Sequence, residues 1–166
     1  KEQYGEAIQA YRRTVHLSPE NHDAWQNLGL AYQAWGQHTD AIESFTTAIE
    51  IKPDSQTASG YLAVSCYEAG EYQKSLDAAA RALELSPDQL WITGYALLSA
   101  AMTGNSAKAF EYIESLSASD PSGNELNRAL YILNESIEKN PSREDLNEIK
   151  AKLEEALQGN EEMQIG

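Results

Sequence analysis

Four prolines recur along this chain at a fixed spacing of 34 residues. They are Pro19, Pro53, Pro87 and Pro121, and their flanking residues repeat with them as LSPE, IKPD, LSPD and SDPS. A fixed period of roughly 20 to 50 residues is typical of proteins built from stacked repeats, in which each repeat buries its apolar face against its neighbours. The spacing therefore predicts an array of similar units, and it argues against an active site.

The clearest unit spans 22–55 and contains two stretches of apolar residues at helical spacing. Gly36 separates the stretches and is expected to end the first helix, while Pro53 stops the second because proline lacks a backbone N–H and clashes with the preceding turn. Large and small residues alternate in a way that favours closely crossing helices. The residues concerned are Trp25, Leu28, Gly29 and Tyr32 in the first stretch, and Ala41, Phe45 and Ala48 in the second.

The pattern Trp25-x2-Leu28-Gly29-x2-Tyr32, followed by Ala41-x3-Phe45-x2-Ala48 and Pro53, resembles the tetratricopeptide repeat. The match is nearly complete in 22–55 and partial in 56–89, and in 90–123 it rests mainly on the period. The resemblance implies an all-α solenoid of antiparallel helix pairs wound into a right-handed superhelix. It also implies a binding module rather than an enzyme, because the signature residues of the family are structural.

The pattern predicts about nine helices, near 3–17, 22–35, 38–52, 55–69, 72–85, 89–103, 106–118, 123–139 and 143–158. We divide the chain into the second helix of a truncated repeat (1–21), repeats in 22–55, 56–89 and 90–123, degenerate capping helices in 124–158, and a tail in 159–166. The chain starts at Lys1 without methionine, so we expect an excerpt of a longer protein or a processed product.

Later repeats depart from the signature at two aromatic positions. Ser59 and then Thr93 stand where the first complete repeat has Trp25, and Cys66 and then Ala100 stand where it has Tyr32. We expect the helices there either to pack closer or to leave small voids.

Composition narrows the classes of partner. The net charge of −14 comes from 26 acidic and 12 basic side chains, and such a surface repels phosphate backbones and anionic lipid headgroups. We therefore expect no nucleic-acid or membrane binding. No apolar run approaches the length of a membrane span, so a soluble protein is expected, with the cytoplasm favoured.

No constellation of residues suggests catalysis, a cofactor or a metal site. The three histidines lack the i, i+4 spacing of a helical metal site, and Cys66 is the only cysteine. We expect Cys66 to be a buried structural thiol, because its sequence neighbours include no basic group that would lower its pKa.

The resemblance implies that the first helix of each repeat lines a concave groove that binds a peptide or a partner helix. The helix face opposite the signature residues is unexpectedly apolar and aromatic, and aromatic residues are common binding anchors. We expect a partner with apolar anchors and basic flanks. For Tyr67 and Trp91 packing against adjacent repeats is the alternative. The candidate groove residues are Asn27, Leu30, Tyr61, Val64, Tyr67, Trp91, Tyr95, Leu98, Met102 and Ile132.

A second hypothesis is a self-assembling structural scaffold. The array begins with an unpaired second helix, on which Ile8, Tyr11 and Val15 are expected to be partly uncovered. An exposed repeat edge of this kind can stack on another copy of the chain. This reading predicts a homo-oligomer formed through the N-terminal edge.

Overall fold

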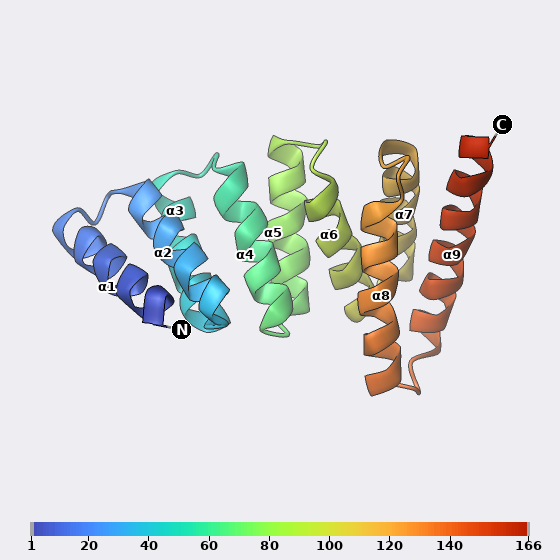
Figure 1. Cartoon of the computed structure of the whole chain (residues 1–166), viewed down its shortest axis with the longest axis horizontal. Helices are drawn as coiled ribbons and strands as arrows, with labels where there is room; N and C mark the ends of the chain where they lie inside the picture. The colour runs from blue at the N-terminus through green and yellow to red at the C-terminus, as the bar shows by residue number, and fades with distance from the viewer. Residues whose placement is uncertain (1, 166) are drawn as a thin grey trace. The chain divides into compact units, whose positions relative to one another are not determined.

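The computed structural model of the chain describes residues 2–165, and within them it contains nine α-helices (Figure 1). The helices form two compact units, which we describe separately: unit 1 is Lys1–Pro87 and unit 2 is Asp88–Gly166. Unit 1 contains α1 (Glu2–Leu17), α2 (His22–Trp35), α3 (His38–Ile51), α4 (Gln56–Glu68) and α5 (Tyr72–Leu85). Unit 2 contains α6 (Leu90–Met102), α7 (Ser106–Ser119), α8 (Asn124–Lys139) and α9 (Glu144–Ile165).

Capping residues set the helix ends within each pair. The side chain of Asn21 accepts a hydrogen bond from the backbone N–H of Ala24 at 3.0 Å and so caps the start of α2. Gly36 ends α2 in the left-handed conformation, with φ of 80°, and its N–H donates to carbonyls of the last turn. Gly70 and Gly104 have φ of 79° and 78°. The three glycines lie one period apart, so the same turn closes the first helix of three successive pairs.

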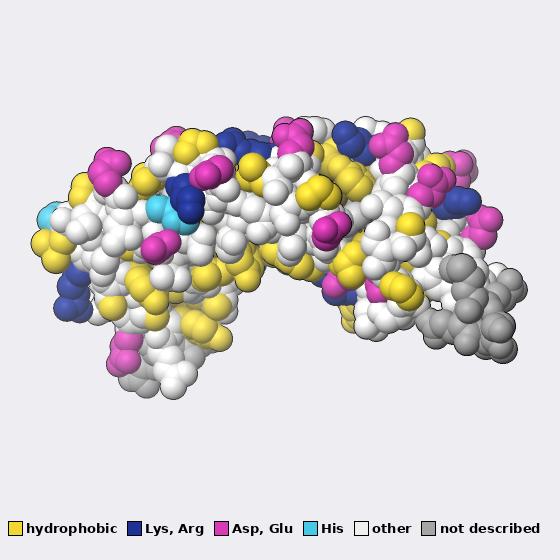
Figure 2. All heavy atoms as spheres, turned by 90° about the horizontal axis from the view of Figure 1, so that it is seen from above, with side chains coloured by type: hydrophobic (Ala, Val, Ile, Leu, Met, Phe, Trp, Pro, Cys, Tyr) yellow, Lys and Arg dark blue, Asp and Glu magenta, His cyan; other side chains and the backbone are white. Residues whose placement is uncertain are grey.

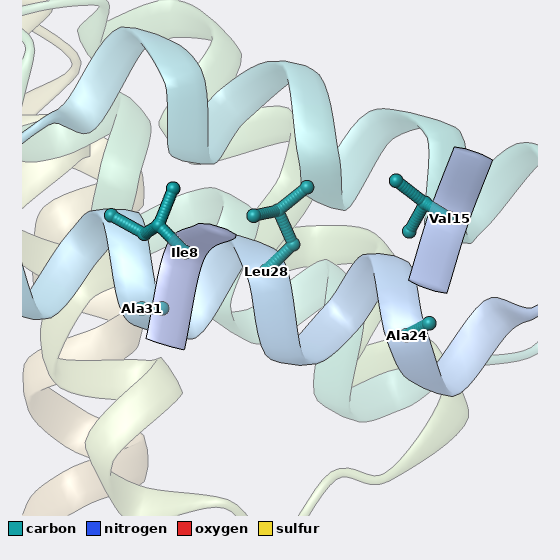
Figure 3. Packing of buried hydrophobic residues seen from close by; sticks show 5 residues of the cluster. All are labelled: Ile8, Val15, Ala24, Leu28 and Ala31. Carbon is teal, nitrogen blue, oxygen red and sulfur yellow. The ribbon is translucent and has the colours of Figure 1, made fainter. Parts of the chain in front are cut away.

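The core of unit 1 begins between α1 and α2. Ile8 and Val15 of α1 pack with three buried residues of α2, among them Leu28, as Figure 3 shows. Ile8 is only 5 % exposed and Val15 only 7 %. This burial corrects the expectation that Ile8 and Val15 are partly uncovered, because α1 packs these residues against α2, whereas Tyr11 is partly exposed as expected. On the described part of α1, Leu17 remains 80 % exposed.

Close helix crossing in unit 1 depends on the small signature residues. Ala41, Ala48 and Phe45 are completely buried. Gly29 lies under the ring of Phe45, so closely that a Cβ atom at this position would be 2.7 Å from Cε1 of the ring. The alternation of large and small residues therefore packs α2 against α3, as the sequence predicted.

The core of unit 2 includes α9, which packs against α6, α7 and α8. Leu146, Ile149 and Leu153 of α9 are completely buried. Just before this helix, the guanidinium of Arg143 donates hydrogen bonds to the carbonyls of Ala101 (2.9 Å) and Met102 (3.3 Å) at the end of α6. Both carbonyls belong to the last turn of α6, where that of Ala101 also accepts from the backbone N–H of Gly104 at 3.1 Å.

The last helix is longer than the sequence predicted. We expected its end at 158, whereas α9 runs to Ile165, into the range 159–166 that we assigned to a tail, and Gly166 lies outside the described residues. Asn160 explains the extension, because it is only 3 % exposed and is bonded to α7 and the turn that follows it. Its side chain accepts from Ser117 Oγ at 3.1 Å and donates to the carbonyl of Asp120 at 3.2 Å.

Candidate functional site

Unit 1 carries four candidate groove residues with partly exposed side chains, namely Asn27 and Leu30 on α2 and Tyr61 and Val64 on α4. The two helices contact each other. The face therefore combines one amide, one phenol and two aliphatic side chains within one unit, and it carries no charge at these four positions.

The ring of Tyr61 is held from inside the unit. It stacks on the buried ring of Phe45, with the ring centroids 5.9 Å apart and the planes inclined by 16°. Gly29 in turn lies against Phe45. A partly exposed tyrosine with this support loses little rotational freedom when it binds a partner, which favours its use as an anchor.

The side chain of Tyr67 was predicted to be accessible in the groove, but the structure shows it buried. It is 9 % exposed, and its ring packs on Tyr72 of α5 with centroids 5.4 Å apart and planes inclined by 59°. The tilted pair fills the junction between α4 and α5. Tyr67 thus follows the packing alternative, because the turn at Gly70 brings the start of α5 over its ring.

The candidate site of unit 2 centres on Tyr95 of α6 and Arg128 of α8. The guanidinium carbon of Arg128 lies 4.6 Å from the centroid of the Tyr95 ring, in a cation–π contact. Arg128 Nε donates to Glu125 Oε2 at 2.8 Å, and Arg128 Nη2 donates to the Trp91 carbonyl at 3.4 Å. Gly94 permits this approach, because a Cβ there would lie 3.0 Å from both Arg128 Nη2 and Glu125 Oε2.

Leu98 is the second correction to the predicted set. Its side chain is 1 % exposed, whereas Trp91, Met102 and Ile132 are partly exposed. The cause is the composition of α6, which is apolar around most of its circumference and is covered by neighbours on several sides. Leu98 therefore supports the surface from beneath and does not form it.

Acidic side chains are scattered over the surface and do not form one patch on the face seen in Figure 2. On the face visible in Figure 2, Asp and Glu side chains are dispersed among uncharged ones in both units. At the candidate site of unit 2 the charge of Arg128 is matched by Glu125 in a 2.7 Å ion pair. The contact of Arg128 with Tyr95 could not be predicted from the sequence, because two positions 33 residues apart carry no local signal of a ring contact.

The described residues contain no cluster of side chains suited to bind a metal ion. No group of three or more His, Cys, Asp or Glu side chains among them could hold a metal ion. Cys66 is buried, and burial raises the pKa of its thiol to about 11, with a smaller contribution from the nearby charge of Glu71. Within 2–165 no helix has both the length and the apolar character needed to cross a bilayer.

Comparison with sequence families gives two overlapping matches. Residues 22–55 match the family described as tetratricopeptide repeat, and residues 1–36 match one described as TPR repeat. A comparison with curated proteins found no match.

Solved structures similar to this chain cover nearly all of it. A crystal structure of MamA has 25 % sequence identity over 98 % of this chain and 93 % of that chain, with a TM-score of 0.73. A second MamA structure gives 25 % identity over 98 % of this chain and 87 % of that chain, with a TM-score of 0.74. YrrB, described as a TPR protein with an unusual peptide-binding site, shares the fold at 17 % identity, with a TM-score of 0.72 over 93 % of this chain and 78 % of that chain.

Proposed function

Because this chain is a tetratricopeptide-repeat protein, we propose that each of its two units can bind a protein segment, unit 1 through the partly exposed aromatic face of α4 and unit 2 through that of α6. Domains of this family are generally protein–protein interaction modules, they bind proteins or peptides, and they are typically non-enzymatic. YrrB is described as having a peptide-binding site, which makes a peptide ligand a reasonable expectation for a chain of the same fold.

The observation that carries the proposal is the pair of tyrosines Tyr61 and Tyr95. They lie one period of 34 residues apart, both are partly exposed, and each has its ring held by a partner of its own unit. Phe45 supports the first ring and Arg128 the second. Interface residues that dominate binding are commonly aromatic side chains set in a fixed orientation, surrounded by contacts that exclude water.

The chemistry around the tyrosines indicates the kind of segment that would fit. Aliphatic neighbours such as Val64 and Met102 favour apolar anchors, and the net charge of −14 favours basic residues on either side of them. Arg128 is already paired with Glu125, so it offers little to an acidic tail. We expect an amphipathic helix or an extended peptide with apolar anchors and Lys or Arg flanks.

The proposal is tested with peptides selected from a random display library on the intact chain. Dissociation constants of the selected peptides are measured by isothermal titration calorimetry for the wild type, Tyr61→Ala and Tyr95→Ala. We expect at least one substitution to weaken binding by about 2 kcal/mol, which is about 30-fold in Kd.

Tyr131→Ala is the matched control. Tyr131 is 66 % exposed on α8 and lies outside the candidate set, so its substitution removes the same aromatic side chain from the surface at a position away from Tyr61 and Tyr95. Equal losses at Tyr131 and at the two candidate tyrosines, or no loss at either candidate, would contradict the proposal.

A further inference from the structure

A second feature of unit 1 lies away from the candidate groove, between α3, α4 and α5. It is a cavity of about 680 Å³ that is open to solvent. Ligand-binding pockets fall within roughly 300 to 1,000 Å³ and are mostly apolar with a few polar groups. The lining residues that matter here are Ile42, Ile49, Leu62, Ala78, Ser59 and Cys66.

The same place one repeat earlier is occupied by the chain's own aromatic side chains. There, between α1, α2 and α3, Trp25 and Tyr32 line a cavity of only about 390 Å³. The residues 34 positions later are Ser59 and Cys66. The sequence predicted either closer packing or small voids at these substitutions, and the cavity in the structure is larger than that expectation.

The second repeat lacks the indole of Trp25, but it keeps a proline at the position whose carbonyl accepts from that indole in the first complete repeat. In the first complete repeat, Trp25 Nε1 donates to the carbonyl of Pro19 at 2.7 Å. The equivalent residue, Pro53, is among those that line the larger cavity, and its carbonyl accepts from Arg81 Nη2 at 2.8 Å. Arg81 is an exposed side chain, so it can release this carbonyl to an incoming donor.

A buried polar atom in the cavity lacks a partner. Ser59 is completely buried, and its Oγ makes no hydrogen bond in the described structure. A buried polar group without a partner destabilises the folded state and calls for an explanation. Ser59 thus lies in the wall of the cavity with its hydroxyl covered, and other polar side chains, among them Thr46 and Asp77, also line the cavity.

We propose that this cavity binds the tryptophan side chain of a partner peptide, which takes the place that Trp25 fills one repeat earlier. The indole packs on Ile49 and Leu62, the equivalents of the Val15 and Leu28 that line the Trp25 cavity, and its N–H donates to Pro53. A neutral ring suits the rim, which carries charges of both signs from side chains such as Lys74 and Asp77. The open side leaves room for the peptide backbone to run past the mouth.

The test uses the blocked tripeptide acetyl-Gly-Trp-Gly-amide and the intact chain. Binding is followed by two-dimensional NMR, with the methyl groups of Ile42, Ile49 and Leu62 as reporters. We expect saturable shifts at these methyl groups, with Kd in the low-millimolar range or tighter for so small a ligand. The peptide with leucine in place of tryptophan is expected to bind at least tenfold more weakly.

Two variants fill the cavity from different helices. Ser59→Trp restores the repeat's own indole from α4, and Ala78→Leu adds volume from α5. Each variant is expected to weaken binding of the tryptophan peptide at least tenfold. Circular dichroism shows whether each variant is folded. If one variant does not fold, the result for the other variant tests the proposal. Tyr61→Ala is expected to leave binding unchanged, which separates this site from the proposed groove.

Three results would overturn the proposal. They are the absence of any saturable shift with the tryptophan peptide, unchanged binding in a folded cavity-filling variant, and binding of free indole but not of the peptide. The last result would assign the cavity to a small aromatic molecule.

Discussion

Replacing Gly29 by alanine should destabilise unit 1, although the same change stabilises most helices. A Cβ at Gly29 would lie 2.7, 2.8 and 2.9 Å from three carbon atoms of the Phe45 ring, distances that real Cβ atoms essentially never show. The ring cannot move freely, because Phe45 is completely buried and stacked on Tyr61. Overpacking of this kind costs about 1–3 kcal/mol.

The free-energy cost of the clash in Gly29→Ala is best measured by comparison with Gly5→Ala. Gly5 also lies inside a helix of unit 1, but a Cβ there would have no neighbour within 4 Å. Alanine in place of glycine stabilises a helix by about 0.5–1 kcal/mol, and this gain applies to both variants. The difference between them therefore isolates the clash at Phe45, about 1–3 kcal/mol in favour of Gly5→Ala.

Urea denaturation followed by circular dichroism provides the measurement, with the slope of the transition compared between variants to detect a change in cooperativity. In thermal melts the difference corresponds to about 2–4 °C for each kcal/mol in a chain of this size. Equal unfolding free energies for Gly29→Ala and Gly5→Ala would refute the reasoning. They would mean that the rings of Phe45 and Tyr61 can shift to accommodate the Cβ without destabilising the folded state.

Two further predictions concern Cys66 and Arg143. Because the pKa of Cys66 in the folded chain, about 11, is raised above its unfolded value near 9.0, the thiol contributes stability below pH 9 that is lost as pH rises towards 11. The unfolding free energy of the wild type should therefore fall over this range by up to about 3 kcal/mol more than that of Cys66→Ala, and parallel pH profiles would exclude the effect. Arg143→Met removes the donors to the last carbonyls of α6 and should cost about 1 kcal/mol in urea denaturation, reduced by solvent because the site is partly exposed. Lys150→Met, which breaks an exposed pair with Glu154, should change stability by less than about 0.5 kcal/mol, and equal effects of the two substitutions would contradict a capping role.

The fold followed from the sequence wherever the 34-residue period held. The predicted range 22–35 coincides with α2, because Asn21 and Gly36 encode both ends of that helix locally. The extension of α9 could not be predicted in the same way. Its cause is Asn160, whose partners lie 40 and 43 residues away and belong to no repeated pattern.

The candidate site was predicted less completely than the fold. Helical geometry identified the face that carries Tyr61 and Tyr95, since spacing alone determines which residues share a face. Spacing could not identify which residues of this face are covered by neighbouring helices. Tyr67 and Leu98 are covered in this way and are therefore buried. Likewise, Ser59 marked a missing aromatic group, but only the packing of three helices decides whether such a gap closes or stays open as a cavity.

The contacts of α9 give unit 2 a different kind of cooperativity from unit 1. Among the described residues of unit 1, helices contact their neighbours in sequence, with α2 and α4 the exception, so the unit resembles a chain of nearest-neighbour couplings. In unit 2, α9 contacts all three other helices, and Arg143 bonds to carbonyls 41 and 42 residues earlier. Unit 1 can therefore lose α1 by fraying while its other helices persist. The loss of α9 removes couplings from every helix of unit 2 at once, so amide hydrogens there should exchange as a single block.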